Sequence, residues 1–192
     1  MSVHLNMIAG LGNPEERYSR TLHNSGFWFV DKLASRFSGR FKYEKRFDAD
    51  VCKIDIAGSD VWLAKPKSYM NQSGGPIRAM LDYYRLTPRN LLIAHDEIDL
   101  SPGTVRLKLG GGHGGHNGLR DVIKHCDRNF MRLRLGVGHP GDKDKVTSYV
   151  LNKASSVAAA AISRNIDDAA DILPLLVEHG LEAAMKRLHT QD

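Results

Sequence analysis

The spacing of hydrophobic residues changes repeatedly along the chain, and this predicts strands that alternate with helices. Short apolar or alternating runs are typical of strands, and apolar residues that recur every three or four positions are typical of helices. The predicted strands are residues 4–9, 51–56, 61–64, 90–94, 105–109 and 131–137. The predicted helices are a segment that begins near Asn24, residues 76–85, residues 117–125 and most of the chain from about residue 145, where Pro174 interrupts the pattern. Asn24 is a residue type that caps helix N-termini well.

This order of elements favours an α/β fold, because strands that alternate with helices are typical of a parallel sheet. Residues 51–56 and 61–64 flank a short turn and are expected to pair with each other. The strict alternation in residues 105–109 and 131–137 indicates that some pairs are antiparallel. We therefore predict a single α/β domain over residues 1–192, with a twisted, mixed and largely parallel β-sheet flanked by α-helices.

The composition is that of an ordinary globular protein, with 42% hydrophobic and 26% charged residues in a chain of 192. No apolar run reaches the length of a membrane span, and the N-terminus lacks the pattern of a signal peptide. Cys52 and Cys126 are the two cysteines and lie far apart, which argues against a disulfide framework or a zinc knuckle. We therefore expect a cytoplasmic protein with reduced thiols and no membrane partner.

The positive charge is concentrated in one part of the chain. Residues 101–153 contain ten Lys and Arg against four Asp and Glu, whereas the remainder contains 17 against 18. Such an excess fits a polyanionic partner. It also fits a solvated surface with a chance excess, and charge alone does not separate the two.

The same segment holds an unusual glycine run. Six glycines occupy residues 110–118, together with two histidines and an asparagine. Glycine is concentrated in this way where the backbone needs positive φ, a tight turn or a ligand close by. A dinucleotide fingerprint fits the spacing, but in so dense a run the match carries little information. The earlier turn at residues 10–14 has Glu15 where the third glycine of that fingerprint belongs.

Two further segments carry candidate catalytic groups. His23 stands at a predicted helix start, and a neutral histidine with a pKa near working pH can act as a general base. Asp96 follows the predicted strand 90–94, at the edge where α/β sheets place their sites, and a carboxylate there can orient a histidine. A polar turn and a capping histidine are the alternative interpretations of these residues.

A third loop and a metal alternative complete the candidates. Asn71, beside Tyr69 and Met70, follows another strand, and its amide suits recognition of a peptide bond. His95, Asp96, His113 and His116 are candidate metal ligands. Because the histidines lack the helical spacing of metalloproteases, we predict no metal and no cofactor.

Taken together and in order, these segments resemble those of bacterial peptidyl-tRNA hydrolases. The matching segments, between residues 7 and 150, are GLGNP, HNSG, KPKSYMNQSG, HDEIDLSPG, KLGGGHGGHNGLRD and RLRLGVGHPGDKDKV. The chain departs from the family pattern at Ser68 and Tyr69, where a Thr-Phe or Thr-Tyr pair is common, and Gln72 lies at a variable position.

The resemblance implies hydrolysis of the ester that joins a peptide to the 3′-terminal ribose of tRNA, which frees tRNA after premature drop-off from the ribosome. It implies that His23 is the general base, that Asp96 orients it, and that Asn13 positions the water or stabilises the oxyanion. A non-catalytic RNA-binding protein of the same fold is the alternative.

The resemblance also implies the residues that bind the substrate. Asn71 and Asn117 are expected to bind the peptide and the tRNA end through their amides. Tyr18, Tyr69, Met70 and His116 are expected to line the cleft. Lys108 and Arg134, and less surely Arg106, are expected to meet tRNA phosphates. A monomer is the default expectation.

Overall fold

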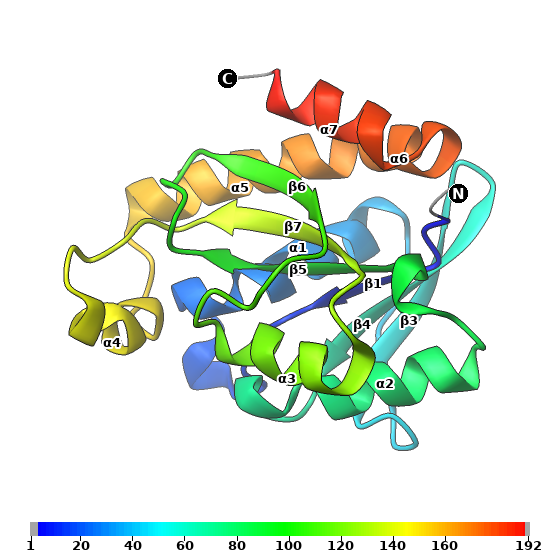
Figure 1. Ribbon diagram of the computed structural model, residues 1–192, viewed down its shortest axis with the longest axis horizontal. Coiled ribbons are helices and arrows are strands. Elements are labelled where there is room, and N and C mark those ends of the chain that lie inside the picture. Colours follow the sequence, from blue (N-terminus) through cyan, green and yellow to red (C-terminus); the bar gives the residue numbers. More distant parts are fainter. Residues whose placement is uncertain (1–3, 191–192) are drawn as a thin grey trace.

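The computed structural model describes residues 4–190, so the outermost residues of the predicted domain, 1–3 and 191–192, lie outside it. One seven-stranded sheet organises the chain, in the order β2-β3-β4-β1-β5-β7-β6 (Figure 1). The strands are β1 Met7–Gly10, β2 Lys42–Glu44, β3 Ala49–Ile56, β4 Ser59–Pro66, β5 Leu91–Glu97, β6 Val105–Leu109 and β7 Met131–Gly136. The α-helices are α1 Ser25–Arg36, α2 Gly74–Tyr83, α3 Asn117–Cys126, α4 Val146–Val150, α5 Ser156–Asp171, α6 Leu173–His179 and α7 Leu181–His189.

The sheet is parallel at its centre and antiparallel at its edges. β4, β1, β5 and β7 run in the same direction, while β3 and β6 run against their neighbours. This agrees with the burial pattern, since all four residues of the central strand β1 are buried and an edge strand such as β6 is half-exposed. The predicted fold class, a mixed and largely parallel sheet flanked by helices, is confirmed.

Helices cover both faces of the sheet (Figure 1). On one face, α1, α5, α6 and α7 pack with residues such as Ile8 and Leu92 into the larger core. On the other face, α2 and α3 pack with Met7 and Ile93 into a second core. Cys52 and Cys126 are buried and free, and burial raises the pKa of their thiols to about 11 and about 12. Within residues 4–190, no helix combines the length and hydropathy needed to cross a bilayer.

The structure corrects five details of the sequence interpretation. The first strand begins at Met7 rather than at residue 4, and β2 was not predicted. β5 continues to Glu97, so Asp96 belongs to the strand rather than to a turn after it. Asn24 occupies the N-cap position of α1, but its side chain makes no capping hydrogen bond. In β7, Arg132 is buried although the alternating pattern predicted an exposed position, because it binds carbonyl groups of the glycine run.

Two glycines allow the start of α1 to lie directly on the end of β1. A Cβ at Gly26 would lie 2.3 Å from the Ala94 carbonyl oxygen and 2.7 Å from both backbone N and O of Leu11. A Cβ at Gly10 would in turn lie 2.3 Å from the Gly26 carbonyl oxygen. These neighbours are backbone atoms of β5, of the residue that follows β1 and of α1 itself, and they cannot move aside easily. The close approach brings the residues just before α1 to the carboxyl ends of β1 and β5.

We therefore predict that Gly26→Ala destabilises the protein by about 1–3 kcal/mol, as an extra methyl group in a packed interior does. The control is Gly75→Ala in α2, where a Cβ would meet nothing within 4 Å. Alanine is expected to stabilise that helix by up to about 1 kcal/mol. Urea unfolding of both variants measures the difference. Equal stability of the two variants would contradict the close approach of the start of α1 to the ends of β1 and β5.

Candidate active site

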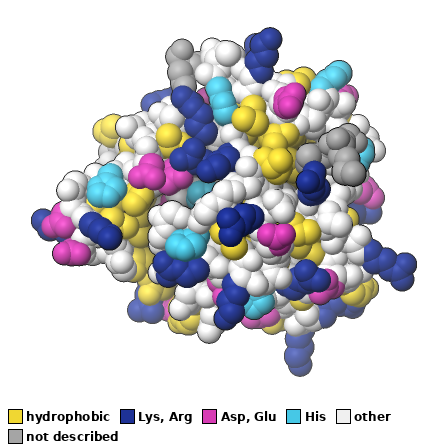
Figure 2. Space-filling model, in the orientation of Figure 1, with side chains coloured by type: hydrophobic (Ala, Val, Ile, Leu, Met, Phe, Trp, Pro, Cys, Tyr) yellow, Lys and Arg dark blue, Asp and Glu magenta, His cyan; other side chains and the backbone are white. Residues whose placement is uncertain are grey.

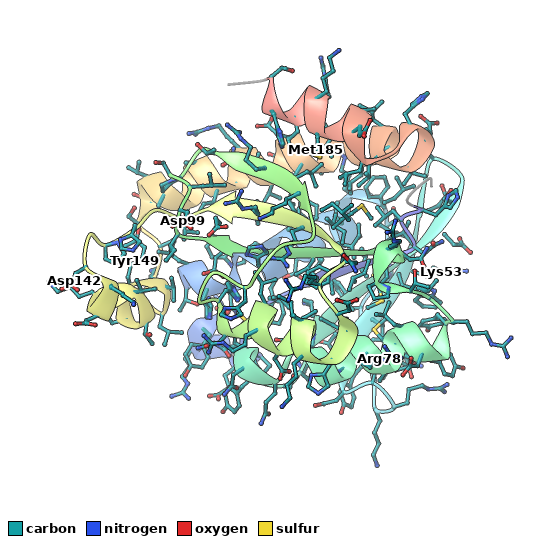
Figure 3. All side chains as sticks on the ribbon, in the orientation of Figure 1. Lys53, Arg78, Asp99, Asp142, Tyr149 and Met185 are labelled. Carbon is teal, nitrogen blue, oxygen red and sulfur yellow. The ribbon has the colours of Figure 1, made fainter. Side chains whose placement is uncertain are left out.

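A cleft of about 710 Å³ opens where the carboxyl end of β5 meets the segments that precede α1 and α3. The far wall of this cleft is the segment of residues 139–151, which includes α4. Tyr149 and Asp142 mark this segment in Figure 3. The predicted site residues that line the cleft are Asn13, Tyr18, His23, Tyr69, Met70, Asn71, Asp96, His116 and Asn117. The structure thus brings together nine residues that the sequence distributes over about a hundred positions.

The Asp96 carboxylate is the centre of the site. It is buried and lies between two imidazoles, with His23 Nδ1 at 3.0 and 2.9 Å from its two oxygens and His116 Nε2 at 2.7 Å from Oδ1. A buried carboxylate without partners would cost several kcal/mol. Hydrogen bonds to a charged group contribute about 1.5–3 kcal/mol each, so the two imidazoles make the burial tolerable.

The hydrogen bonds of His116 fix its tautomer. Its Nδ1 accepts from the backbone N–H groups of Gly118 and Leu119, at 3.1 and 3.2 Å, and so caps α3. Since Nδ1 carries a lone pair, the proton is on Nε2 and is donated to Asp96. His116 is therefore a neutral donor to the carboxylate and the N-cap of a helix, a role that the sequence did not suggest.

This tautomer also disfavours a metal ion at the site. His23, Asp96 and His116 have ligand atoms within 4.8 Å of one another, which is close enough to hold an ion. A metal on Nε2 of His116 would need the proton on Nδ1, where two backbone N–H groups already point at the ring. Of the ligands considered from the sequence, His95 and His113 do not belong to this cluster.

The pKa values of the pair follow from burial and mutual attraction. Burial is the largest single influence on His23 and lowers its pKa, but the charge and the hydrogen bond of Asp96 together outweigh it, so the pKa lies above 6.5. Burial also works against ionisation of Asp96, yet the two imidazoles hold the pKa of that carboxyl far below its usual range. Asp96 is therefore an anion at neutral pH, and its charge and hydrogen bond raise the pKa of His23.

The amide of Asn13 has a defined orientation. Its Oδ1 accepts from the Met70 backbone N–H at 2.8 Å, so the opposite end of the amide is the Nδ2 donor. That donor has no acceptor among the described residues, and Asn13 lines the cleft. The free end of the Asn13 amide is thus a donor rather than an acceptor.

The remaining substrate-binding candidates lie at the rim of the cleft. Asn71 is exposed on a 3₁₀ turn (Met70–Gln72), and the Tyr69 hydroxyl donates to the Glu15 carboxylate. The Asn117 Oδ1 accepts from Arg120 Nη1 at 2.8 Å, which leaves its Nδ2 as a donor. These groups present both donors and acceptors around the partly exposed His23.

Lys108 and Arg134 do not line the cleft but lie on the neighbouring strands β6 and β7. In the register of these strands Lys108 is opposite Arg132, and Arg106 is opposite Arg134. Arg134 is paired with Glu97, Nε to Oε1 at 2.8 Å, whereas Lys108 is exposed. Like charges directly opposite each other are unfavourable in a sheet. Figure 2 shows Lys and Arg side chains gathered over these strands.

Comparisons with known proteins now decide the family. A family model described as "Peptidyl-tRNA hydrolase" matches residues 7–192. The chain is 48% identical to a peptidyl-tRNA hydrolase of Psychromonas ingrahamii, over 99% of this chain and 98% of that protein. It is 50% identical to one of Xanthomonas oryzae pv. oryzae, over 97% and 96%.

The chain belongs to the peptidyl-tRNA hydrolase family.

The fold agrees with this assignment. The crystal structure of peptidyl-tRNA hydrolase from Acinetobacter baumannii has a TM-score of 0.95 and 44% identity, over 98% of this chain and 96% of that one. The resemblance drawn from the motifs is thus confirmed. A dinucleotide site at the glycine run is unsupported, because the strand before it, β6, is antiparallel to β7 and does not begin a parallel crossover.

Sequence reasoning missed one wall of the peptidyl-tRNA hydrolase cleft. His139, Lys143, Thr147, Val150 and Leu151 all line it. The segment was part of the family resemblance, but no role was assigned to it, because its pattern resembles an ordinary polar loop and helix. The Tyr149 hydroxyl fastens α4 to the body of the protein by donating to the Val137 carbonyl at 2.6 Å.

His95 is buried next to Asp96 but does not line the cleft. Its Nδ1 donates to the Asp96 carbonyl at 2.8 Å, and its Nε2 has no partner among residues 4–190. Burial, with a smaller influence from His116, lowers the pKa of His95 to about 3. The histidine is therefore neutral in the folded protein under conditions where an unfolded chain would protonate it.

We predict that His95→Phe makes the free energy of unfolding depend less on pH below 6.5. With a lowered folded-state pKa, His95 contributes stability above pH 6.5 that is lost as the pH falls toward 3. The contribution of His23, whose pKa is raised, is complete below pH 6.5, and that of Asp96 is lost only below about pH 4. Between pH 6.5 and 4.5 the wild type should therefore lose about 2 kcal/mol more than the variant.

Urea unfolding at several pH values measures this difference. The same substitution at His179, which is exposed on α6, is the control for removal of a histidine. Parallel profiles for wild type and His95→Phe would contradict the neutral, buried state of His95.

Proposed function

We propose that this chain hydrolyses the ester between a peptide and the 3′-terminal ribose of tRNA, with His23 as general base. The observation that carries the proposal is the pairing of His23 with buried Asp96. Because Nδ1 donates to the carboxylate, the lone pair of the imidazole is on Nε2, which has no partner among the described residues. A water on that side can be deprotonated as it attacks the ester carbonyl.

The rest of the reaction uses groups already in place. The attacking water forms a bond to the carbonyl carbon and gives its proton to His23, while the carbonyl oxygen becomes an oxyanion that accepts from Asn13 Nδ2. Collapse of this intermediate breaks the bond to the ribose oxygen, which takes the proton from His23. The products are a free peptide acid and tRNA with a free terminal hydroxyl. General-base action of this kind contributes about 10²–10⁴-fold in rate.

Recognition of the peptide rests on amide groups at the rim. Asn117 keeps a donor for a carbonyl of the peptide, and Asn71 offers both a donor and an acceptor. Aminoacyl-tRNA carries a charged amine and lacks the acyl carbonyl that such a donor requires. A site built to bind a polar group discriminates strongly against a ligand that lacks it.

Several finer points belong to the same proposal. The substrate is peptidyl-tRNA that has left the ribosome prematurely, and the enzyme acts as a cytoplasmic monomer without metal or cofactor. A purely RNA-binding role is less favoured, because such a role does not require a base, its carboxylate and an oriented donor in one cleft.

Turnover of peptidyl-tRNA and aminoacyl-tRNA at matched salt tests the function. We expect hydrolysis of the N-acylated substrate and much slower hydrolysis of the free aminoacyl ester. His23→Ala should lower kcat at least about 100-fold, because it removes the base, while binding of tRNA persists. Equal rates on both substrates would contradict the proposed discrimination by the amides at the rim. Near-normal turnover by His23→Ala would contradict the assignment of His23 as the base.

Lys108 should contribute to affinity through phosphate. We predict that Lys108→Ala weakens binding of tRNA regardless of its sequence and reduces the slope of log K against log salt by about one. The matched control is Lys53→Ala, an exposed lysine on β3, which lies next to the opposite edge strand β2 (Figure 3). Titrations at several salt concentrations measure both. An unchanged slope for Lys108→Ala would exclude a phosphate contact by this residue.

A further inference from the structure

Asn24 is a buried polar residue next to the proposed base that the mechanism does not use. It is 2% exposed and ends a 3₁₀ turn, Leu22–Asn24, that also carries His23. The sequence predicted a helix cap at this position, but Gly26 and its neighbours bring the turn against the end of β1 instead. The side chain therefore lies beside Asn13 rather than over the first turn of α1.

The amide of Asn24 satisfies both backbone groups of Asn13. Its Oδ1 accepts from the Asn13 N–H at 2.9 Å, and its Nδ2 donates to the Asn13 carbonyl at 2.9 Å. The side chain thus pairs with the loop as a neighbouring strand would. Asn13 lies in an irregular segment, so this two-point contact supplies the backbone pairing that a strand or helix would otherwise provide.

A second contact fixes the side chain of Asn13. Its Oδ1 accepts from the Met70 N–H at 2.8 Å, which leaves Nδ2 as the free end of an amide that lines the cleft. The backbone of Asn13 is held by Asn24, and its amide is held by Met70. With both in place, the donor has a fixed position relative to His23, because Asn24 and His23 are adjacent residues of one short turn.

We propose that Asn24 is a positioning residue that holds the Asn13 donor at a fixed place beside the base, without touching the substrate itself. This inference rests on the proposed hydrolysis. It explains why His23 and Asn24 are both polar. His23 provides the base, and Asn24 holds Asn13, whose amide stabilises the oxyanion. Loss of one such donor costs about 10²–10³-fold in kcat, and a displacement of about 1 Å costs about 10²-fold.

The test is Asn24→Asp, which has the same shape. It keeps the acceptor for the Asn13 N–H but places a second carboxylate oxygen against the Asn13 carbonyl, where a donor is needed. We expect kcat for peptidyl-tRNA to fall about 10- to 100-fold while KM changes less than about threefold. The dependence of kcat on pH should still show the titration of His23. Asn24→Ser, a neutral variant, tests this without adding a charge beside His23.

The matched control is Asn165→Asp. Asn165 is also a buried asparagine, 4% exposed, whose Nδ2 donates to a backbone carbonyl, that of Gly103 at 3.1 Å. It lies on α5 and does not line the cleft. This variant should lose stability in the same way, seen in urea unfolding, but keep kcat. A general loss of stability therefore does not account for a fall in kcat that is confined to the Asn24 variants.

A double-mutant cycle with Asn13→Ala decides whether Asn24 acts through Asn13. Once the donor is absent, Asn24→Ser should have little further effect on kcat. Independent, multiplying losses would overturn the inference, as would normal kcat in folded Asn24→Asp and Asn24→Ser. Failure of the proposed function would look different, because the wild type and Asn165→Asp would then both fail to hydrolyse peptidyl-tRNA.

Discussion

The buried carboxylate of Asp96 is the constraint on which the site depends. It ionises inside the protein only because His23 and His116 both donate to it. This requirement fixes the tautomer of each imidazole, and through the cap made by His116 it also fixes the start of α3. The His23 imidazole, a helix terminus and a buried charge are thus one cooperative arrangement, in which removal of any member leaves a buried polar group without a partner.

The sheet makes this arrangement possible by close packing. Asp96 lies near the end of β5, and the glycines at 10 and 26 let the turn that carries His23 approach it. On the other side of the cleft, a Cβ at Gly118 would lie 2.5 Å from the Met70 sulfur, so the loop that orients Asn13 also packs tightly against α3. Of the candidate catalytic groups, Asp96 belongs to β5, while His23 and Asn13 come from a short turn and a loop. Backbone contacts with the central strands hold these segments in place.

The glycine run has a structural role beside this chemistry. Arg132 is buried behind it and donates to the carbonyls of Gly111 and Gly112, and its guanidinium lies 4.8 Å from the Phe130 ring centre. Burial lowers the pKa of this arginine, yet its charge remains. The run therefore joins the cationic strands β6 and β7 to the N-terminus of α3, and so connects their charged surface with the cleft.

The sequence by itself determined the alternation of strands and helices except for β2, the fold class and the residue types of the candidate site, because hydrophobic period and unusual loop composition are local properties. The motifs also identified His23, Asp96 and Asn13 as a group through the family resemblance. Only the tertiary structure decided which groups pair. It assigned Asn24 to Asn13 rather than to its own helix, made His116 a cap, buried Arg132 and placed residues 139–151 over the cleft. These outcomes depend on contacts between segments far apart in the chain, where burial and the need to satisfy every polar group outweigh local preference.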